Sequence, residues 1–179
     1  MIKIIFAALT FLISLLGYCS MRTTNVVTGE KQYVAMNHKE EIALGMKSLS
    51  SMEKQYGKFD TDTQAEEYVE KIGRNIIQTP IITKTPYKFD FHVINADKTI
   101  NAFALPGGQV FITSGLLKRL KTDGQLAGIL GHEVAHVVAR HGSQQLAKQK
   151  LTQGLLTATD IAIYNPEKPN KSQVSSVMT

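Results

Sequence analysis

The chain has 179 residues, of which 43% are apolar and 20% charged, and its formal net charge is +5. This length and composition are typical of one globular domain with a sizeable core. The lysines and arginines are spread along the chain without a basic run beside aromatic residues, which argues against nucleic-acid binding. A weak attraction to anionic membrane surfaces is compatible with the charge.

The N-terminus, MIKIIFAALTFLISLLGYCS, has the layout of a bacterial secretory signal: Lys3, an apolar run over residues 4–16, then small and polar residues. The run is short for a membrane-spanning helix, which needs about 20 apolar residues. We therefore predict a signal peptide over residues 1–18 and an exported protein of the periplasm or cell envelope. An uncleaved anchor is the alternative.

The only cysteine, Cys19, stands at the end of this run and has no disulfide partner within the chain. The stretch LLGYC resembles a lipoprotein signal, in which the cysteine is lipidated and becomes the new N-terminus. Leu16 fits that pattern, whereas Tyr18 departs from it, because a small residue normally precedes the cysteine. We predict a membrane-anchored lipoprotein with its lipid on Cys19, and stable anchoring takes two or more chains.

Residues 19–36 are polar and predict a leader segment outside the core. A helix is expected from His38, with Asn37 as N-cap, Glu40 as capping-box partner and Gly57 as its stop. A second helix is expected from about Thr61 until Pro80. The helical spacing places Ile42, Met46 and Leu49 on one side of the first helix, and Tyr68, Ile72, Asn75 and Ile76 on one face of the second.

After Pro80 the spacing of apolar residues changes from the helical pattern to the alternating pattern of strands. YKFDFHVIN, at residues 87–95, alternates as a strand does, and residues 99–115 supply two more short strands joined by a turn at 106–108. We expect the three strands to form a meander. Helices on both sides of it in the sequence predict an α+β domain, mainly helical, over residues 37–179.

Three helical segments follow the strands. Ser114 is predicted to cap a short helix over 115–121. Thr122 is predicted to cap the next helix, which should run over 123–141 with Gln125 as capping-box partner and Gly142 as C-cap. Residues 143–164 predict a further helix, and 165–173 a loop.

The stretch GHEVAH carries the chemistry. His132 and His136 are four residues apart, so on a helix both imidazoles lie on one face and can reach one Zn²⁺. Glu133 is rotated by about 100°, a poor place for a ligand but a good one for hydrogen-bonding a water that the ion activates. Apolar neighbours predict a buried helix, where a metal would compensate the cost of burying the histidines. The alternative is a pair of core histidines with other partners.

The remaining histidines offer no clear third ligand. His141 lies about 140° around a continuous helix from His136, so we interpret it as a helix C-terminal residue that favours the dipole there. His92 is expected on a strand and His38 at the start of a helix, both in surface or structural positions.

GHEVAHVVARH, with NAFALPGGQVFITSGLL about 20 residues upstream, resembles the gluzincin metallopeptidases related to HtpX and the CAAX prenyl protease. The similarity is greatest to their exported bacterial branch, which resembles the mitochondrial Oma-type proteases, and the leader TNVVTGEKQYVAMNHKEEIALG fits that branch too. The resemblance implies a zincin-like domain with His132 and His136 as zinc ligands and Glu133 as general base. It also implies that the strand with Asn101, Ala102 and Phe103 binds the substrate backbone.

In this family the third ligand is a glutamate in an E-x-x-A-D-like motif on a later helix. The acids that follow His136 are Asp160 and Glu167, and neither has that pattern around it. We therefore expect the domain to be incomplete at its C-terminus, with the ligand beyond Thr179. A chain with two ligands should bind zinc weakly and be inactive or nearly so.

The sequence thus predicts a metalloendopeptidase with one Zn²⁺ per chain that hydrolyses polypeptides, as the resemblance suggests misfolded cell-envelope proteins. The alternative is a non-catalytic chaperone or interaction protein that keeps the fold. A zinc deformylase is disfavoured, because that class uses a cysteine ligand and the one cysteine lies in the export signal.

Overall fold

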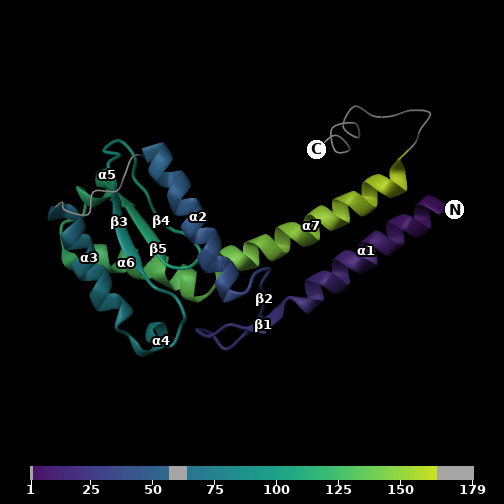
Figure 1. Ribbon diagram of the computed structural model, residues 1–179, viewed down its shortest axis with the longest axis horizontal. Helices are drawn as coiled ribbons and strands as arrows, with labels where there is room; N and C mark the ends of the chain where they lie inside the picture. The colour runs from purple at the N-terminus through teal and green to yellow at the C-terminus, as the bar shows by residue number, and fades with distance from the viewer. Residues whose placement is uncertain (1, 57–63, 165–179) are drawn as a thin grey trace.

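The computed structural model describes residues 2–56 and 64–164, which form a compact body with a two-helix arm (Figure 1). Seven helices lie in these residues: α1 (Ile2–Ser20), α2 (His38–Tyr56), α3 (Gln64–Ile77), α4 (Pro80–Thr83), α5 (Ser114–Leu117), α6 (Asp123–Val138) and α7 (His141–Ile163). Five strands lie in the same residues: β1 (Arg22–Thr24), β2 (Lys31–Tyr33), β3 (Asp90–Ile94), β4 (Ala102–Ala104) and β5 (Gln109–Thr113). The mainly helical α+β class is confirmed.

The body is built around a three-stranded sheet, but the predicted meander is wrong. The spatial order is β3-β5-β4, with β3 parallel and β4 antiparallel to β5. All five residues of β5 are buried, whereas those of β4 are half-buried. A strand buried on both faces needs neighbours on both sides, so β5 takes the centre and β4 an edge. The predicted turn does join β4 to β5, and Gly107 and Gly108 adopt φ values of 92° and 119° there.

Helices α3 and α6 cover one face of the sheet, and their apolar residues form the core with β3 and β5. Its buried members are Val69, Ile72, Phe91, Val110, Ile112, Leu126, Leu130, Val134 and Val138. On the other face Phe111 stacks against His92 and Phe103, with ring centroids 5.0 Å apart in each pair. The packed core on the first of these faces therefore holds α6 in a fixed position on the sheet.

Two of the predicted helix N-caps, Asn37 and Thr122, are confirmed. The Asn37 side chain accepts a hydrogen bond from the Glu40 amide at 3.0 Å, and Glu40 accepts one from the Asn37 amide at 2.7 Å. Thr122 accepts a bond from the Gln125 amide at 3.2 Å. For α5 the predicted cap is wrong by one residue, since Thr113 rather than Ser114 is the N-cap.

The faces of α2 and α3 that share the predicted spacing are only partly buried in the structure. In α2, Met46 is 52% exposed, and the buried residues are Glu41 and Gly45. In α3, Tyr68 and Asn75 are exposed, whereas Ile72 is buried. The physical reason is that α2 lies so close to the loop between β4 and β5 that only small or hydrogen-bonded residues fit against it. The predicted boundaries at Gly57 and Thr61 lie outside the described residues.

The helix with the GHEVAH stretch is shorter than predicted. It ends at Val138 with Ala139 as C-cap, Arg140 adopts the left-handed conformation (φ 63°, ψ 34°), and α7 begins at His141. Gly142, the predicted C-cap, lies inside the first turn of α7. Arg140 takes the position normally given to glycine because its side chain is held by hydrogen bonds there. The chain therefore turns sharply just after the candidate metal ligands.

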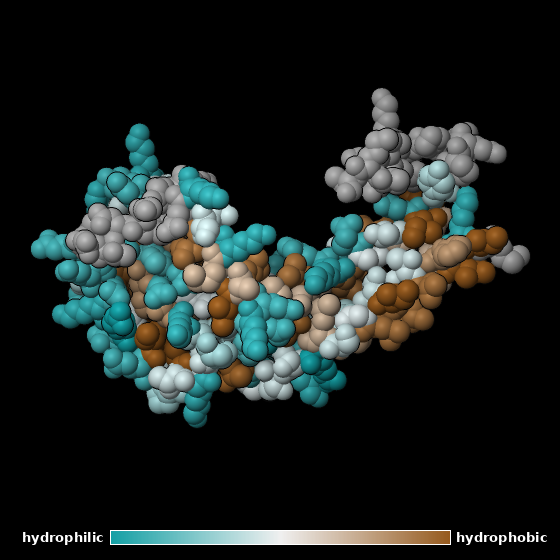
Figure 2. Space-filling view, viewed as in Figure 1, coloured by the Kyte–Doolittle hydropathy of each residue, from teal (hydrophilic) through white to brown (hydrophobic). Residues whose placement is uncertain are grey.

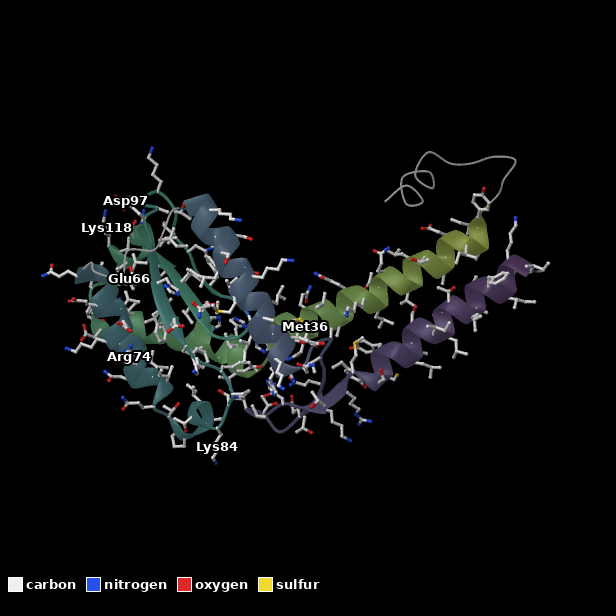
Figure 3. The ribbon with its side chains drawn as sticks, in the orientation of Figure 1. Met36, Glu66, Arg74, Lys84, Asp97 and Lys118 are labelled. Atoms are coloured by element: carbon white, nitrogen blue, oxygen red, sulfur yellow. The ribbon has the colours of Figure 1, made fainter. Side chains whose placement is uncertain are left out.

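Residues 19–36, predicted as a leader segment, include an ordered antiparallel hairpin of β1 and β2. The segment after β2 is tied to the first turn of α7: Ala35 donates its amide proton to the Ser143 carbonyl at 3.2 Å, and Met36 donates to Ser143 Oγ at 3.0 Å. Figure 3 shows Met36 at this junction of the hairpin, α2 and α7.

The arm consists of α1 and α7, which lie side by side and antiparallel (Figure 1). Lys3 Nζ donates a hydrogen bond to the Tyr164 carbonyl at 2.9 Å, and Gly154 faces Ser14 where the helices approach closely. Most apolar side chains of α1 remain exposed, which gives the arm its hydrophobic lower edge in Figure 2. By length and composition α1 could cross a membrane, a test that an export signal also passes. The predicted signal peptide and the division into domains stay predictions.

Gly45 marks the close approach of α2 to the body, and we expect Gly45→Ala to destabilise the protein by about 1–3 kcal/mol. A Cβ atom at Gly45 would stand 1.8 Å from the Pro106 carbonyl oxygen, so backbone would have to move. The matched control is Gly131→Ala in α6, where a Cβ meets nothing within 4 Å, and where alanine should stabilise by about 1 kcal/mol through helix propensity. Urea unfolding measures both; equal effects of the two substitutions would contradict the close approach.

Candidate metal centre on helix α6

Helix α6 is buried on one face and open on the other. Its buried residues are Leu126, Leu130, Val134, Val137 and Val138, and they pack toward the sheet and α3. Because residues three and four apart share a face, this packing leaves His132 and His136 toward the open side, whereas Glu133, three residues after Leu130 and four before Val137, is half-buried at the border of that side. The rigid apolar face thus fixes the direction in which these three side chains point.

His132 and His136 meet as the sequence predicts. Their Nε2 atoms are 3.0 Å apart and their rings are nearly perpendicular, at 87°. Two nitrogen ligands of a tetrahedral zinc ion with bonds of about 2.0–2.1 Å are separated by about 3.3 Å. The pair therefore fits two adjacent positions of such an ion with little movement.

The expected burial of these histidines is wrong. His132 is exposed, and His136 is half-buried, because the buried face of α6 lies on its other side. Burial of the two rings therefore does not by itself require a metal. What supports a metal site is the meeting of two imidazole nitrogens, an arrangement that a bound cation stabilises.

Glu133 lines an open groove together with His132. The groove has a volume of about 450 Å³ and runs between α6 and the start of β4, where it is lined by Ile100, Asn101, Ala102, Leu116, Gly128, Ile129, His132 and Glu133. Of the three residues predicted to bind substrate, Asn101 and Ala102 thus lie beside His132 and Glu133. Phe103 does not line this groove, and its ring stacks on Phe111 on the opposite face of the sheet.

His141 lies against His136, contrary to the prediction that it points away. The premise of that prediction, a continuous helix, does not hold, and His141 begins α7 instead of ending α6. The Nδ1 atoms of His136 and His141 are 2.5 Å apart, and their ring centroids are 4.7 Å apart. Burial, followed by the nearby His136 and His132, lowers the pKa of the His141 imidazole below its usual value.

The other predicted positions lie apart from this cluster. Cys19 is exposed near the end of α1, and Asp160 is exposed on α7. His38 Nδ1 is 2.8 Å from the Tyr87 hydroxyl, and His92 Nε2 is 2.7 Å from Gln109 Oε1, so both serve structure as predicted. Glu167 lies outside the described residues. Within residues 2–56 and 64–164, no three His, Cys, Asp or Glu side chains are grouped to hold one metal ion.

A buried polar network next to the histidines is absent from the sequence predictions. Arg140 Nε donates to both carboxylate oxygens of Glu41 at 3.1 Å, and the Tyr87 hydroxyl donates to the same carboxylate at 2.5 Å. Arg140 also donates to the Met36 carbonyl. Burial and the bond to Glu41 raise the pKa of Tyr87 well above its usual value. The network lines a cavity of about 40 Å³ that His136 also faces, so it supports the end of α6.

The only sequence signal for this network is that Glu41 and Arg140 lie in the two stretches, TNVVTGEKQYVAMNHKEEIALG and GHEVAHVVARH, that carry the family resemblance. Glu41 lies in the first turn of α2 and Arg140 four residues after His136, and nothing in their local pattern connects them. Their pairing depends on the sharp turn between α6 and α7, which is a tertiary feature.

The comparisons with known proteins concern the region that holds this site. The model of the family described as Peptidase family M48 matches residues 63–176. The mitochondrial metalloendopeptidase OMA1 of Schizosaccharomyces pombe is 42% identical over 80 residues, which are 45% of this chain and 23% of that protein. The beta-barrel assembly-enhancing protease of Escherichia coli K12 is 36% identical over 84 residues, 47% of this chain and 17% of that protein. The matched part thus spans about a fifth of these relatives.

Proposed function

The chain belongs to peptidase family M48, and on that basis we propose that it is a zinc-dependent metalloendopeptidase. The observation that carries this proposal is the pair of His132 and His136 Nε2 atoms, 3.0 Å apart on the open side of α6. M48 peptidases are zinc metallopeptidases, and these two atoms would hold one Zn²⁺ per chain. The third position needs a ligand other than the described side chains.

Glu133 would act as the general base. A zinc ion, when bound, polarises the scissile carbonyl and makes water more acidic. The Glu133 carboxylate lies in the same groove as His132, one helical position further on, where it can accept a proton from the attacking water. The same carboxyl group then donates this proton to the leaving amine, so that hydrolysis needs no covalent intermediate on the protein.

The substrate would bind as an added strand along β4. The pairing register of β4 with β5 indicates which β4 residues have backbone groups free to bind this substrate strand. The Thr113 amide donates to the Asn101 carbonyl, and the Leu105 amide donates to the Gln109 carbonyl. The alternating pattern of an antiparallel pair therefore turns the backbone groups of Ala102 and Ala104 away from β5. These two residues could pair with an extended peptide. Among the predicted substrate-binding residues, Ala102 would therefore bind backbone, and Asn101 would contribute as a residue that lines the groove.

We also propose that the protein acts on polypeptides at the cell envelope. Misfolded polypeptides are among the substrates that we propose, as the sequence resemblance suggests. One relative named above is described as a beta-barrel assembly-enhancing protease. The apolar α1 suits export or anchoring, and lipidation of Cys19 would place the protein at a membrane. Proteins that expose extended segments present the backbone groups that an edge strand recognises.

Zinc binding and cleavage of fluorogenic casein test the proposal. We expect His132→Ala to lose zinc, and Glu133→Gln to keep zinc while slowing any cleavage by at least about 10²-fold, because the general base is lost. Cleavage by the unaltered chain should be slow, since the described residues provide two ligands where catalytic zinc sites have three. The control is Glu67→Gln, at an exposed glutamate of α3. Zinc binding that survives His132→Ala, or cleavage that survives Glu133→Gln, would contradict the proposal.

A further inference from the structure

The contact between His136 and His141 exists because the chain breaks its helix between them. On one continuous helix these side chains would diverge by about 140°. The left-handed Arg140 redirects the chain, so that the first residue of α7 returns its ring to the last turn of α6. The contact is therefore a product of the α6–α7 turn.

The two nitrogens of His136 face different partners. Its Nε2 faces His132 Nε2 at 3.0 Å, and its Nδ1 faces His141 Nδ1 at 2.5 Å. A neutral imidazole carries one proton, on one nitrogen or the other. If Nε2 is to bind a cation it must be bare, so the proton must sit on Nδ1, where His141 Nδ1 can accept it in a hydrogen bond.

We propose that His141 is a positioning residue that accepts a hydrogen bond from His136 Nδ1–H and so keeps His136 Nε2 free and aimed at the metal position. The inference rests on the proposed function, because it assigns the metal-binding nitrogen of His136. Metal-binding histidines generally donate their second ring N–H to a fixed acceptor, which sets both tautomer and orientation. His141 contacts the edge of the ring remote from Nε2, which is the place of such an acceptor and not of a third ligand.

The body of the protein holds His141 in this place. On one side of it, Arg140 is anchored by Glu41 and the Met36 carbonyl. On the other side, Ser143 is 1% exposed and accepts hydrogen bonds from the Ala35 and Met36 amides. The backbone around His141 is thus fixed at two points, so its ring can hold His136 at little further cost in conformational entropy.

Zinc affinity in four variants tests the inference. By chelator competition with the full chain, we expect His141→Ala to lower zinc affinity about 10–100-fold, the usual cost of losing such a partner. His141→Asn should recover most of that loss, because its side chain can place an acceptor near the Nδ1 position. The control Gln145→Ala, at an exposed residue one turn further along α7, should bind zinc like the unaltered chain. His132→Ala should lose zinc.

Two further measurements separate positioning from a structural role. NMR of isotope-labelled imidazoles should show a proton on His136 Nδ1 that is protected from exchange in the zinc-loaded chain and in His141→Asn, and lost to exchange in His141→Ala. The thermal midpoint of the metal-free protein should be the same for His141→Ala and Gln145→Ala.

The outcomes are distinct. Zinc affinity in His141→Ala equal to that of Gln145→Ala would overturn the positioning role, while the proposed function would stand if His132→Ala loses zinc. Loss of zinc in His141→Ala as complete as in His132→Ala would also overturn it, because His141 would then be a ligand. Failure of the unaltered chain to bind zinc would overturn the proposed function. In that case the hydrogen bond from His136 Nδ1–H to His141 is tested by NMR of the metal-free protein. Absence of a protected proton at His136 Nδ1 would contradict this hydrogen bond.

Discussion

Arg140→Ala is expected to lower the free energy of unfolding by about 3–5 kcal/mol, because it leaves the buried Glu41 carboxylate without its cation. The side chains of Glu41 and Arg140 are only 3% and 9% exposed, and the guanidinium contacts both carboxylate oxygens. An unpaired charge there cannot regain the water that burial removed. Urea unfolding at neutral pH measures the loss.

Two further variants serve as controls for Arg140→Ala. Lys118→Ala removes an ion pair with Asp97 that is exposed on both sides, at the end of the body away from the arm in Figure 3, and should cost no more than about 1 kcal/mol. Adding Glu41→Gln to Arg140→Ala should recover part of the loss, because a neutral amide is less costly to bury than a carboxylate. A loss in Arg140→Ala no larger than that in Lys118→Ala would show that the buried pair does not hold the turn.

Phe111→Ala is expected to cost about 3–5 kcal/mol, the range for removing a large aromatic side chain from a packed interior. Phe111 is 0% exposed at the middle of the central strand, and its ring stacks between those of His92 and Phe103. Its loss would leave a cavity beside the ring of Phe103 in β4, the strand along which we propose that substrate binds.

A second phenylalanine provides the control for this substitution. Phe6 is 58% exposed on α1, so Phe6→Ala should change stability by no more than about 0.5 kcal/mol. Denaturant midpoints of the two variants measure the difference. If both variants unfold at the same denaturant concentration, the stacked face of the sheet contributes little to stability.

The sequence predicts well what depends on neighbouring residues. The caps at Asn37 and Thr122 are confirmed, because a capping side chain bonds to amides two or three residues away. The turn at Gly107 is confirmed for a similar reason, since a φ of 92° there is a requirement of a single residue. The pairing of His132 with His136 also follows from helix geometry alone.

What the sequence does not predict depends on distant contacts. A meander would place β4 at the centre of the sheet, whereas the structure places β5 there. Which strand is central depends on which strand is buried by the helices, and this is a tertiary contact. Glycine is the usual left-handed residue at a helix end, so the sequence predicts Gly142 as the C-cap. The structure uses Arg140 in the left-handed position instead, and bonds to Glu41 and Met36, about a hundred positions earlier, offset its conformational cost. The position of His141 follows from that turn and is missed with it.

The pairing of α1 with α7 makes the order of one helix depend on whether the other stays in the chain. Ala7 and Ala158 are buried in the arm, and Gly154 packs against Ser14. Among the described elements, the outer half of α7 has α1 as its main neighbour (Figure 1). Removal of residues 1–18, the predicted signal peptide, would take most of that neighbour away, and a helix without a packed face is marginal in water. Such a cleavage would therefore also change how far α7 extends as a folded element, although about 120 residues separate the two helices in the sequence.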